Sequence, residues 1–165
     1  MNNIKLEIDK LKNKLSETIR DNLQVNTNFY RTLGDYIVQV IRNRTRQGYG
    51  VDVPRGTKKP LKPLSSKYIN YRIKYKNLSS ETNPGTSNLT LTGHMLDSLT
   101  SIATNKYVRI DFTDKFAKDK AKWNAESKEK RIFMNLSSDE YKDISEIVKD
   151  YLLEKINLAI KKEFR

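Results

Sequence analysis

Residues 89–112 constrain the fold of this chain more than any other stretch of the sequence. Leu89 and Leu91 alternate with threonines, which predicts a short half-buried strand. Thr92 is placed to cap the helix that follows, because its side-chain oxygen can accept a hydrogen bond from a free backbone N–H group of the first turn. Gly93 puts no side chain against whatever packs on that turn. The apolar face of this short helix consists of Met95, Leu96 and Leu99.

A β-hairpin is predicted directly after the short helix. Residues 99–103 and 107–112 both suit strands, and the Thr-Asn-Lys sequence between them supplies a turn. In the second strand Val108, Ile110 and Phe112 face one side, and the more polar residues between them face the other. The segment therefore predicts a strand, a capped short helix and an antiparallel hairpin.

The longest predicted helix runs from residue 138 to the C-terminus. Ser137 and Glu140 have the spacing of a capping box, in which each side chain accepts a hydrogen bond from the other residue's backbone N–H group. Apolar residues then recur at helical spacing, at Tyr141, Ile144, Val148, Tyr151, Leu152, Ile156, Ala159 and Ile160. We expect this helix to pack across the small antiparallel sheet.

Two further helices are predicted in the N-terminal third. Residues 3–23 carry a single narrow apolar stripe, which suits docking on a partner or neighbouring subunit and equally suits packing on the chain's own domain. Residues 27–46 carry a broader apolar face, made of Leu33, Tyr36, Ile37, Val40 and Ile41. Gly34 costs this second helix about 1 kcal/mol relative to alanine, so we expect a close packing contact there.

The central connections are predicted from local signals. Residues 51–64 hold three of the four prolines and show no useful periodicity, which predicts an extended loop. Ser65 or Ser66 caps a helix that reaches about residue 77. A polar loop over residues 78–87 contains an Asn-Pro-Gly turn signal.

Two short elements are predicted between the hairpin and the last helix. Residues 114–125 can form a helix whose one side presents Phe116, Ala117, Lys120 and Trp123. Residues 132–134 are an apolar run long enough for one strand of a sheet.

These elements together predict an α+β fold. We expect a small antiparallel β-sheet packed by a long C-terminal helix, with N-terminal helices and extended loops. Residues 1–48 are expected to form an N-terminal helical arm and residues 49–165 an α+β core with long loops, within a single structural domain. A chain of 165 residues that is only 36% hydrophobic predicts a modest core, so it would gain from burying more surface in an oligomer.

Composition excludes several classes of protein. The chain has no cysteine, which excludes a disulfide scaffold, thiolate zinc sites and a cysteine nucleophile. No apolar run approaches the roughly 20 residues needed to cross a bilayer, and the charged N-terminus does not resemble a signal peptide. We therefore expect a soluble protein that is made in the cytoplasm and has no membrane partner.

The positive charge of the chain is concentrated in residues 42–76. The net charge of the chain is +12, and this segment carries +10 of it, with Asp52 as its one acid. Such clustering favours an anionic partner, either nucleic acid or an acidic protein surface. The candidate contact residues are Arg42, Arg44, Arg46, Arg55, Lys58, Lys59, Lys62, Lys67, Arg72, Lys74 and Lys76.

Three tyrosines are interleaved with these basic residues. Tyr68, Tyr71 and Tyr75 could offer stacking surfaces to nucleic acid. Their spacing of three and four is also how a helix buries an aromatic face, and we expect at least two of them in the core. No base-reading motif accompanies the basic segment, so it does not predict sequence-specific recognition.

The sequence offers little to an enzyme. His94 is the only histidine, and the chain has no nucleophile elbow, phosphate-binding glycine loop or zinc-protease motif. Asp111 and Asp114 are close in sequence, as are Asp139 and Glu140, but the second pair falls in a helix first turn, where carboxylates are favoured on electrostatic grounds alone. We therefore expect no catalytic residues, no metal and no cofactor.

Three segments together resemble the virion-morphogenesis and tail-completion family of tailed phages. A leucine-rich approach, a Thr-Gly step, a hydrophobic residue and a serine precede the hairpin. A proline-and-leucine segment followed by a helix with an early tyrosine lies upstream, and an Arg-x-Phe strand running into a serine-capped helix lies downstream. The residues that carry the resemblance, in the order of the family, are Leu61, Leu64, Tyr68, Leu91, Thr92, Gly93, Met95, Ser98, Arg131 and Phe133.

The resemblance implies a structural protein of the phage neck. Such a protein is made in the host cytoplasm and assembles as a ring of identical subunits that joins the head to the tail, with DNA passing through the lumen. Its implied partners are the portal or head-connector proteins and the tail terminator or tail tube, with possible non-specific contact with the packaged DNA. The alternative is a basic nucleic-acid-binding module that uses the surface of residues 42–76.

Overall fold

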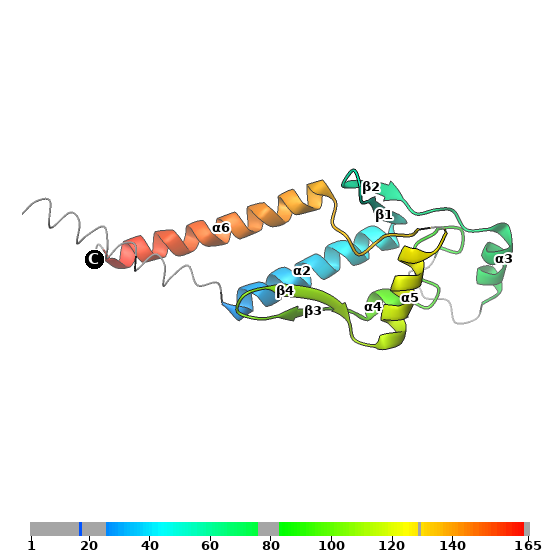
Figure 1. Ribbon diagram of the computed structural model, residues 1–165, viewed down its shortest axis with the longest axis horizontal. Helices are drawn as coiled ribbons and strands as arrows, with labels where there is room; N and C mark the ends of the chain where they lie inside the picture. The colour runs from blue at the N-terminus through cyan, green and yellow to red at the C-terminus, as the bar shows by residue number, and fades with distance from the viewer. Residues whose placement is uncertain (1–16, 18–25, 76–82, 129, 164–165) are drawn as a thin grey trace, which may run out of the picture.

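The computed structural model describes residue 17 and residues 26–75, 83–128 and 130–163. In chain order the elements are α2 (Thr27–Arg46), β1 (Tyr49–Asp52), β2 (Thr57–Pro60), α3 (Ser66–Lys74), α4 (His94–Asp97), β3 (Leu99–Ala103), β4 (Val108–Phe112), α5 (Lys115–Glu126) and α6 (Ser138–Glu163). The predicted α+β class is confirmed, with two small antiparallel sheets of two strands each and a long C-terminal helix (Figure 1). Apart from residue 17, the helix expected over residues 3–23 lies outside the described residues. No helix in the described ranges is long and apolar enough to span a membrane.

Helix α2 begins and ends where the sequence predicts. Asn26 caps it, because its side-chain oxygen accepts a hydrogen bond from the backbone N–H of Phe29 at 2.8 Å. The close contact expected at Gly34 is confirmed: a Cβ atom added there would lie 2.5 Å from Cγ2 of Val108 and 2.6 Å from Cβ of Ser101. The backbone of α2 therefore lies directly on the β3–β4 hairpin.

The core of the described chain is built around α2. Its buried apolar side chains are Leu33, Ile37, Val38, Ile41, Met95, Leu96, Leu99, Ala117, Ala121 and Phe133. Four of these side chains, Leu33, Ile37, Val38 and Ile41, come from α2. The face of α2 also differs in detail from the prediction, because Val38 is buried and Tyr36 is exposed.

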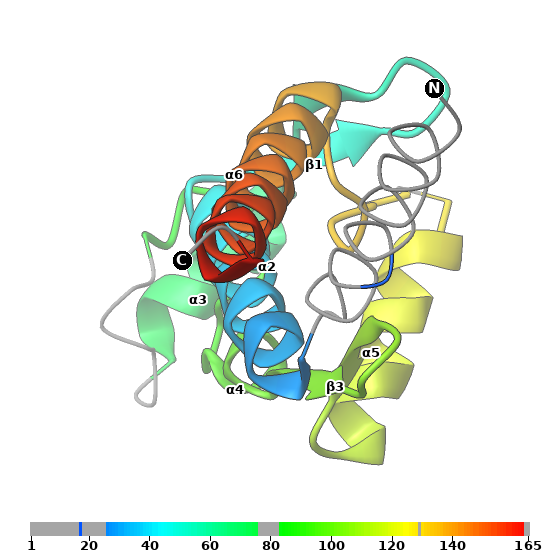
Figure 2. The ribbon, with the colours of Figure 1, turned by 90° about the vertical axis from the view of Figure 1, so that its left-hand side faces the viewer.

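Helix α6 runs beside α2 in the opposite direction (Figures 1 and 2). Its predicted capping box is confirmed, since the N–H of Ser137 donates to Oε2 of Glu140 at 2.8 Å and the N–H of Glu140 donates to Oγ of Ser137 at 3.3 Å. Farther along, the rings of Phe29 and Tyr151 stack with centroids 3.8 Å apart. The helix that covers the β3–β4 sheet is α2, and α6 packs against α2, which corrects the packing expected for α6.

A hairpin replaces the loop expected over residues 51–64. Strands β1 and β2 pair in antiparallel register from Tyr49 with Pro60 to Asp52 with Thr57. The turn between them closes on the carbonyl of Asp52, which accepts from the N–H groups of Arg55 at 3.1 Å and Gly56 at 2.7 Å. Gly56 has φ of +64°, a left-handed conformation that glycine adopts without strain. The turn residues, and not a hydrophobic alternation, specify this hairpin.

The strand expected over residues 132–134 does not form. Its backbone approaches β1 through one hydrogen bond, from the N–H of Val51 to the carbonyl of Ile132 at 2.9 Å. A Cβ atom at Gly50 would collide with that same carbonyl, so the glycine permits the close approach. One bond does not make a strand ladder, and the apolar run instead places Phe133 in the core.

The strand expected over residues 89–92 is also absent. Leu89 has φ of +56°, which interrupts any extended run. Gly93, whose φ is +78°, is the N-cap residue of helix α4, and no side chain caps the helix, so the predicted cap by Thr92 is wrong. The short helix itself is confirmed, with Met95 and Leu96 buried.

The β3–β4 hairpin forms as predicted. Leu99 pairs with Phe112 and Ala103 with Val108. Val108, Ile110 and Phe112 pack against the core, as the alternation of the second strand predicts.

Helices α3 and α5 form at their predicted positions. Ser65 caps α3 and Asp114 caps α5, each through a hydrogen bond from a backbone N–H three residues on. The buried side of α5 is formed by Ala117 and Ala121. Phe116 and Trp123, which were expected on a common face with Ala117, are both more than half exposed.

Candidate functional site

Most of the motif residues surround one groove. It has a volume of about 690 Å³ and lies between α3, the segment that leads into α4, and α5. The motif residues on its wall are Leu64, Tyr68, Leu91, Thr92, Gly93, Met95 and Arg131. Motif residues from three separated parts of the sequence therefore meet at a single surface feature.

The three other motif residues lie away from the groove. Leu61 and Phe133 are buried apolar side chains. The hydroxyl of Ser98 lies 2.7 Å from the carbonyl of His94 and 2.9 Å from Oδ2 of Asp114, so it joins α4 to the start of α5. Their roles are in the framework that supports the groove.

The groove combines an apolar floor with an aromatic rim. Its aliphatic side chains are Leu64, Leu89, Leu91 and Met95. Tyr68 on α3 and Trp123 on α5 also line it and are 39% and 63% exposed. A surface of this kind can bury apolar and planar groups of a partner.

Three cations line the groove, namely Arg72, Lys120 and Arg131. The described lining residues include no carboxylate. Arg131 is held in place because its Nε donates to Oγ of Ser87 at 3.4 Å and its backbone N–H donates to the carbonyl of Asn124 at 2.7 Å. The charged part of the wall is therefore wholly positive over the described residues.

Arg72 is the most unusual of these cations because it is buried, with 2% of its surface exposed. Its terminal nitrogens donate to the carbonyl of Thr86 at 2.7 Å and to Oδ1 of Asn88 at 3.1 Å, while its Nε has no hydrogen-bond partner. Burial lowers the pKa of the guanidinium, and the nearby Tyr68 opposes that shift. Within the described ranges no carboxylate lies within ion-pair distance of Arg72.

Four arginines of the basic segment hold the fold together and are not free for a partner. Besides Arg72, Arg42 donates to the carbonyls of Leu96 at 2.9 Å, Asp97 at 3.0 Å and Leu99 at 2.8 Å. Arg46 pairs with Oδ1 of Asp97 at 2.8 Å. The positive charge counted along the sequence therefore overstates the charge offered to an anionic partner.

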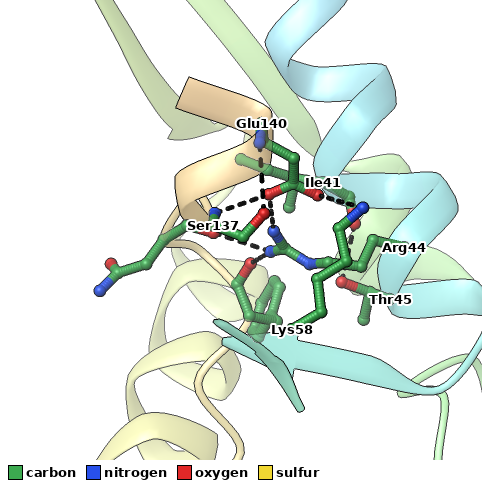
Figure 3. A network of polar contacts seen from close by, with 8 residues as sticks. Ile41, Arg44, Thr45, Lys58, Ser137 and Glu140 are labelled. Carbon is green, nitrogen blue, oxygen red and sulfur yellow. Dashed lines mark hydrogen bonds and ion pairs between the residues drawn. The ribbon is translucent and has the colours of Figure 1, made fainter. Parts of the chain in front are cut away.

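The fourth internal arginine, Arg44, lies in the polar network of Figure 3. Its guanidinium donates to Oε2 of Glu140, to the carbonyl of Phe133 and, at 2.8 Å, to the carbonyl of Asn135. Burial lowers the pKa of Arg44, and the charge of Glu140 opposes the shift. Lys58 reaches the same carboxylate from the hairpin, with its Nζ 3.9 Å from Oε1.

The other described basic residues are exposed and form two groups. Arg55, Lys58 and Lys59 lie on the β1–β2 hairpin, and Lys67 and Lys74 lie on α3, with Lys62 in the segment between. Lys76 lies outside the described residues. These six cations are the exposed basic residues of the described part of residues 42–76.

The tyrosines of α3 do not form the expected buried face. Tyr68 and Tyr71 are 39% and 50% exposed, and their rings stack on each other with centroids 5.9 Å apart. The ring centroids of Tyr71 and Tyr75 lie 5.6 Å apart. Arg72 ties α3 to the segment that contains Thr86 and Asn88. Tyr68 lines the groove, whereas Tyr71 is not among its lining residues.

Asp111 and Asp114 have structural partners. Asp111 pairs with Lys118 at 2.8 Å, and this interaction lowers the pKa of Asp111. Asp114 accepts from the N–H of Ala117 at 2.8 Å, which lowers its pKa, and its Oδ2 lies 3.0 Å from Nε2 of His94. Over the described residues, no three histidine or carboxylate side chains gather as metal ligands.

Sequence reasoning alone did not place Arg72, Lys120 and Trp123 on one surface. Trp123 was expected only as part of a helix face, although an exposed tryptophan is a common mark of a binding surface. Arg72 was counted as a surface cation, and no local pattern indicates that it is buried. No family model, curated protein or solved structure was found to match this chain.

Proposed function

We propose that this protein is a structural component of the neck of a tailed phage, where it forms a ring that joins the head to the tail and encloses the DNA. The observation that carries the proposal is the gathering of the motif residues around one groove. Seven of the ten motif residues line this groove, and they come from three separated parts of the sequence. The resemblance and the geometry thus support the same interpretation.

Exposed apolar side chains further support a protein that assembles. Those on α6 are Tyr141, Ile147, Leu153, Leu158 and Ile160, and others include Ile73 and Ile102. Large exposed hydrophobic side chains gain free energy when a neighbouring chain covers them. In a closed ring each subunit would present one such surface to the next and receive a different one from its other neighbour.

The nucleic-acid alternative has its own support in the outward-facing tyrosines of α3. Tyr68 and Tyr71 lie beside Lys67 and Lys74, a combination that suits stacking on single-stranded bases. It is weakened because four of the arginines that suggested it are bound within the chain. The neck interpretation is therefore the primary proposal.

Analytical ultracentrifugation and negative-stain electron microscopy of the purified chain test the proposal. We expect closed rings with a fixed number of subunits that grow in abundance with protein concentration. A chain that remains monomeric at all concentrations, and also when mixed with candidate portal and tail proteins, would overturn it. A parallel salt series on random-sequence DNA measures the alternative, which predicts tight binding that falls steeply with salt.

A further inference from the structure

We propose that the groove between α3 and α5 binds an extended segment of a partner chain that carries apolar side chains beside carboxylates. The inference rests on the proposed function, since a protein that joins two rings needs a site for a segment of its neighbour. It adds to that function the chemistry of the segment and the residues that receive it.

The floor of the groove selects for apolar side chains. Leu64, Leu91 and Met95 come from different parts of the chain and line the same hollow. Water in contact with such a surface is released when an aliphatic or aromatic side chain enters. A wholly polar or phosphate-rich segment would leave this floor uncovered.

The cations of the wall select for negative charge. Arg72 is 2% exposed, its Nε has no partner, and it is not paired with any described carboxylate. Both terminal nitrogens of Arg72 are already bound within the chain, so Arg72 adds positive charge to the groove from below its surface. Burying a charge without a counter-charge is costly, and a partner's carboxylate in the groove would reduce that cost without a direct contact. Lys120 and Arg131 extend the positive wall, and the described lining residues offer no competing carboxylate.

The rim indicates how the segment is held. Tyr68 on α3 and Trp123 on α5 line the groove, and both rings are exposed enough to pack against a bound chain. Aromatic side chains could equally stack on nucleobases, but the leucines and the methionine of the floor favour a peptide. The geometry therefore points to an acidic and apolar peptide, with single-stranded nucleic acid as the competing outcome.

Trp123 provides the measurement, because it is the only tryptophan of the chain. The probe is the peptide acetyl-Gly-Asp-Leu-Glu-Phe-Asp-Gly-amide, titrated into the full-length chain while tryptophan emission is recorded. One matched peptide replaces the acids with Asn and Gln, and a second replaces Leu and Phe with Ser. A ten-nucleotide oligo-dT is the fourth probe. We expect a saturable change in tryptophan emission with the first peptide. The other three probes should bind at least tenfold more weakly.

Variants locate the binding to the groove. Arg131→Gln and Lys120→Gln each remove one positive charge from the wall, and we expect each to weaken the peptide at least fivefold. Lys74→Gln removes one exposed charge from α3 outside the groove lining and is the matched control, with affinity within twofold of the parent. Circular dichroism of each variant verifies that the fold is retained. Arg72 is left unchanged because it anchors α3.

Several results would overturn the inference. These are equal binding of the neutral peptide, tighter binding of oligo-dT, or equal weakening by Lys74→Gln. The experiment distinguishes failure of this inference from failure of the proposed function, because peptide binding is measured on the isolated chain whatever its assembly state. If the chain forms rings but does not bind the peptide, only the inference is contradicted. If the chain binds the peptide but remains a monomer, only the neck proposal is contradicted.

Discussion

Arg44 at the end of α2 and Glu140 in the first turn of α6 form a buried ion pair. Glu140 also accepts the N–H of Ser137, so a single carboxylate completes the capping box of α6 and neutralises the arginine of α2 (Figure 3). The start of the longest helix is therefore specified both by its own sequence and by a residue almost 100 positions earlier.

Removing one partner of this pair should destabilise the protein strongly. We expect Arg44→Met to lower the free energy of unfolding by about 3 kcal/mol, because Glu140 loses its buried counter-charge. It keeps only the exposed Lys58, whose Nζ lies 3.9 Å from Oε1. Urea denaturation followed by circular dichroism measures the change.

The control keeps the cap and removes the charge. Glu140→Gln preserves the capping-box pattern, and in the double variant Arg44→Met, Glu140→Gln neither charge remains. We expect the double variant to be more stable than Arg44→Met alone. Equal or lower stability of the double variant would show that packing of the arginine stem, and not charge, dominates at this site.

The contact at Gly34 predicts that substitution by alanine lowers stability, although helix propensity alone predicts that it raises stability. Alanine should favour the helix by about 1 kcal/mol, but the added methyl group overlaps Val108 and Ser101 and costs about 1–3 kcal/mol. We expect Gly34→Ala to be net destabilising in thermal denaturation. Gln39→Ala, at an exposed position of the same helix, should change stability by less than about 0.5 kcal/mol. An increase in the melting temperature of Gly34→Ala would contradict the contact.

The start of α4 predicts different effects at two adjacent residues. Gly93→Ala should cost about 1–2 kcal/mol, because its φ of +78° is unfavourable for a residue with a Cβ atom. Gly93→Asn should cost less, since asparagine enters this conformation more readily. Thr92→Ala should be nearly neutral because Thr92 makes no cap. The reverse order of these costs, measured by urea denaturation, would restore the sequence-based assignment of the cap.

The cap of α5 predicts a pH dependence. The backbone N–H of Ala117 lowers the pKa of Asp114 in the folded chain, so the carboxylate stabilises the fold above its unfolded pKa of about 3.9 and loses that effect as pH falls through the folded pKa. We expect Asp114→Asn, which retains a capping oxygen, to be less stable than the parent at pH 6. The difference should shrink as the pH is lowered toward 2. A difference that stays constant in urea denaturation over this range would contradict the assignment.

Most of the helices and the β3–β4 hairpin could be predicted from sequence because their signals are local. The caps at Ser65, Asp114 and Ser137 and the alternation in β4 depend only on residues within a few positions. The β1–β2 hairpin was missed because its turn signal was outweighed by the prolines of the same segment. The strand expected at Leu89 failed for the opposite reason, since its alternation is overruled by a left-handed backbone angle.

The candidate site could be predicted only in part. Sequence identified the motif residues but not that they surround one groove, because their convergence depends on tertiary packing. It also could not separate a surface arginine from an internal one. Arg42 and Arg72 are long-range donors to backbone carbonyls, a role that leaves no mark in the neighbouring sequence.

The outer strand of the first hairpin limits how this protein can associate. Strand β2 is paired on one side, with β1, and its sequence Thr-Lys-Lys-Pro is exposed along its whole length. Pro60 has no N–H group to donate, and Lys58 and Lys59 would repel an identical edge. This edge therefore resists the strand-to-strand pairing that leads to fibrils, even at high local concentration.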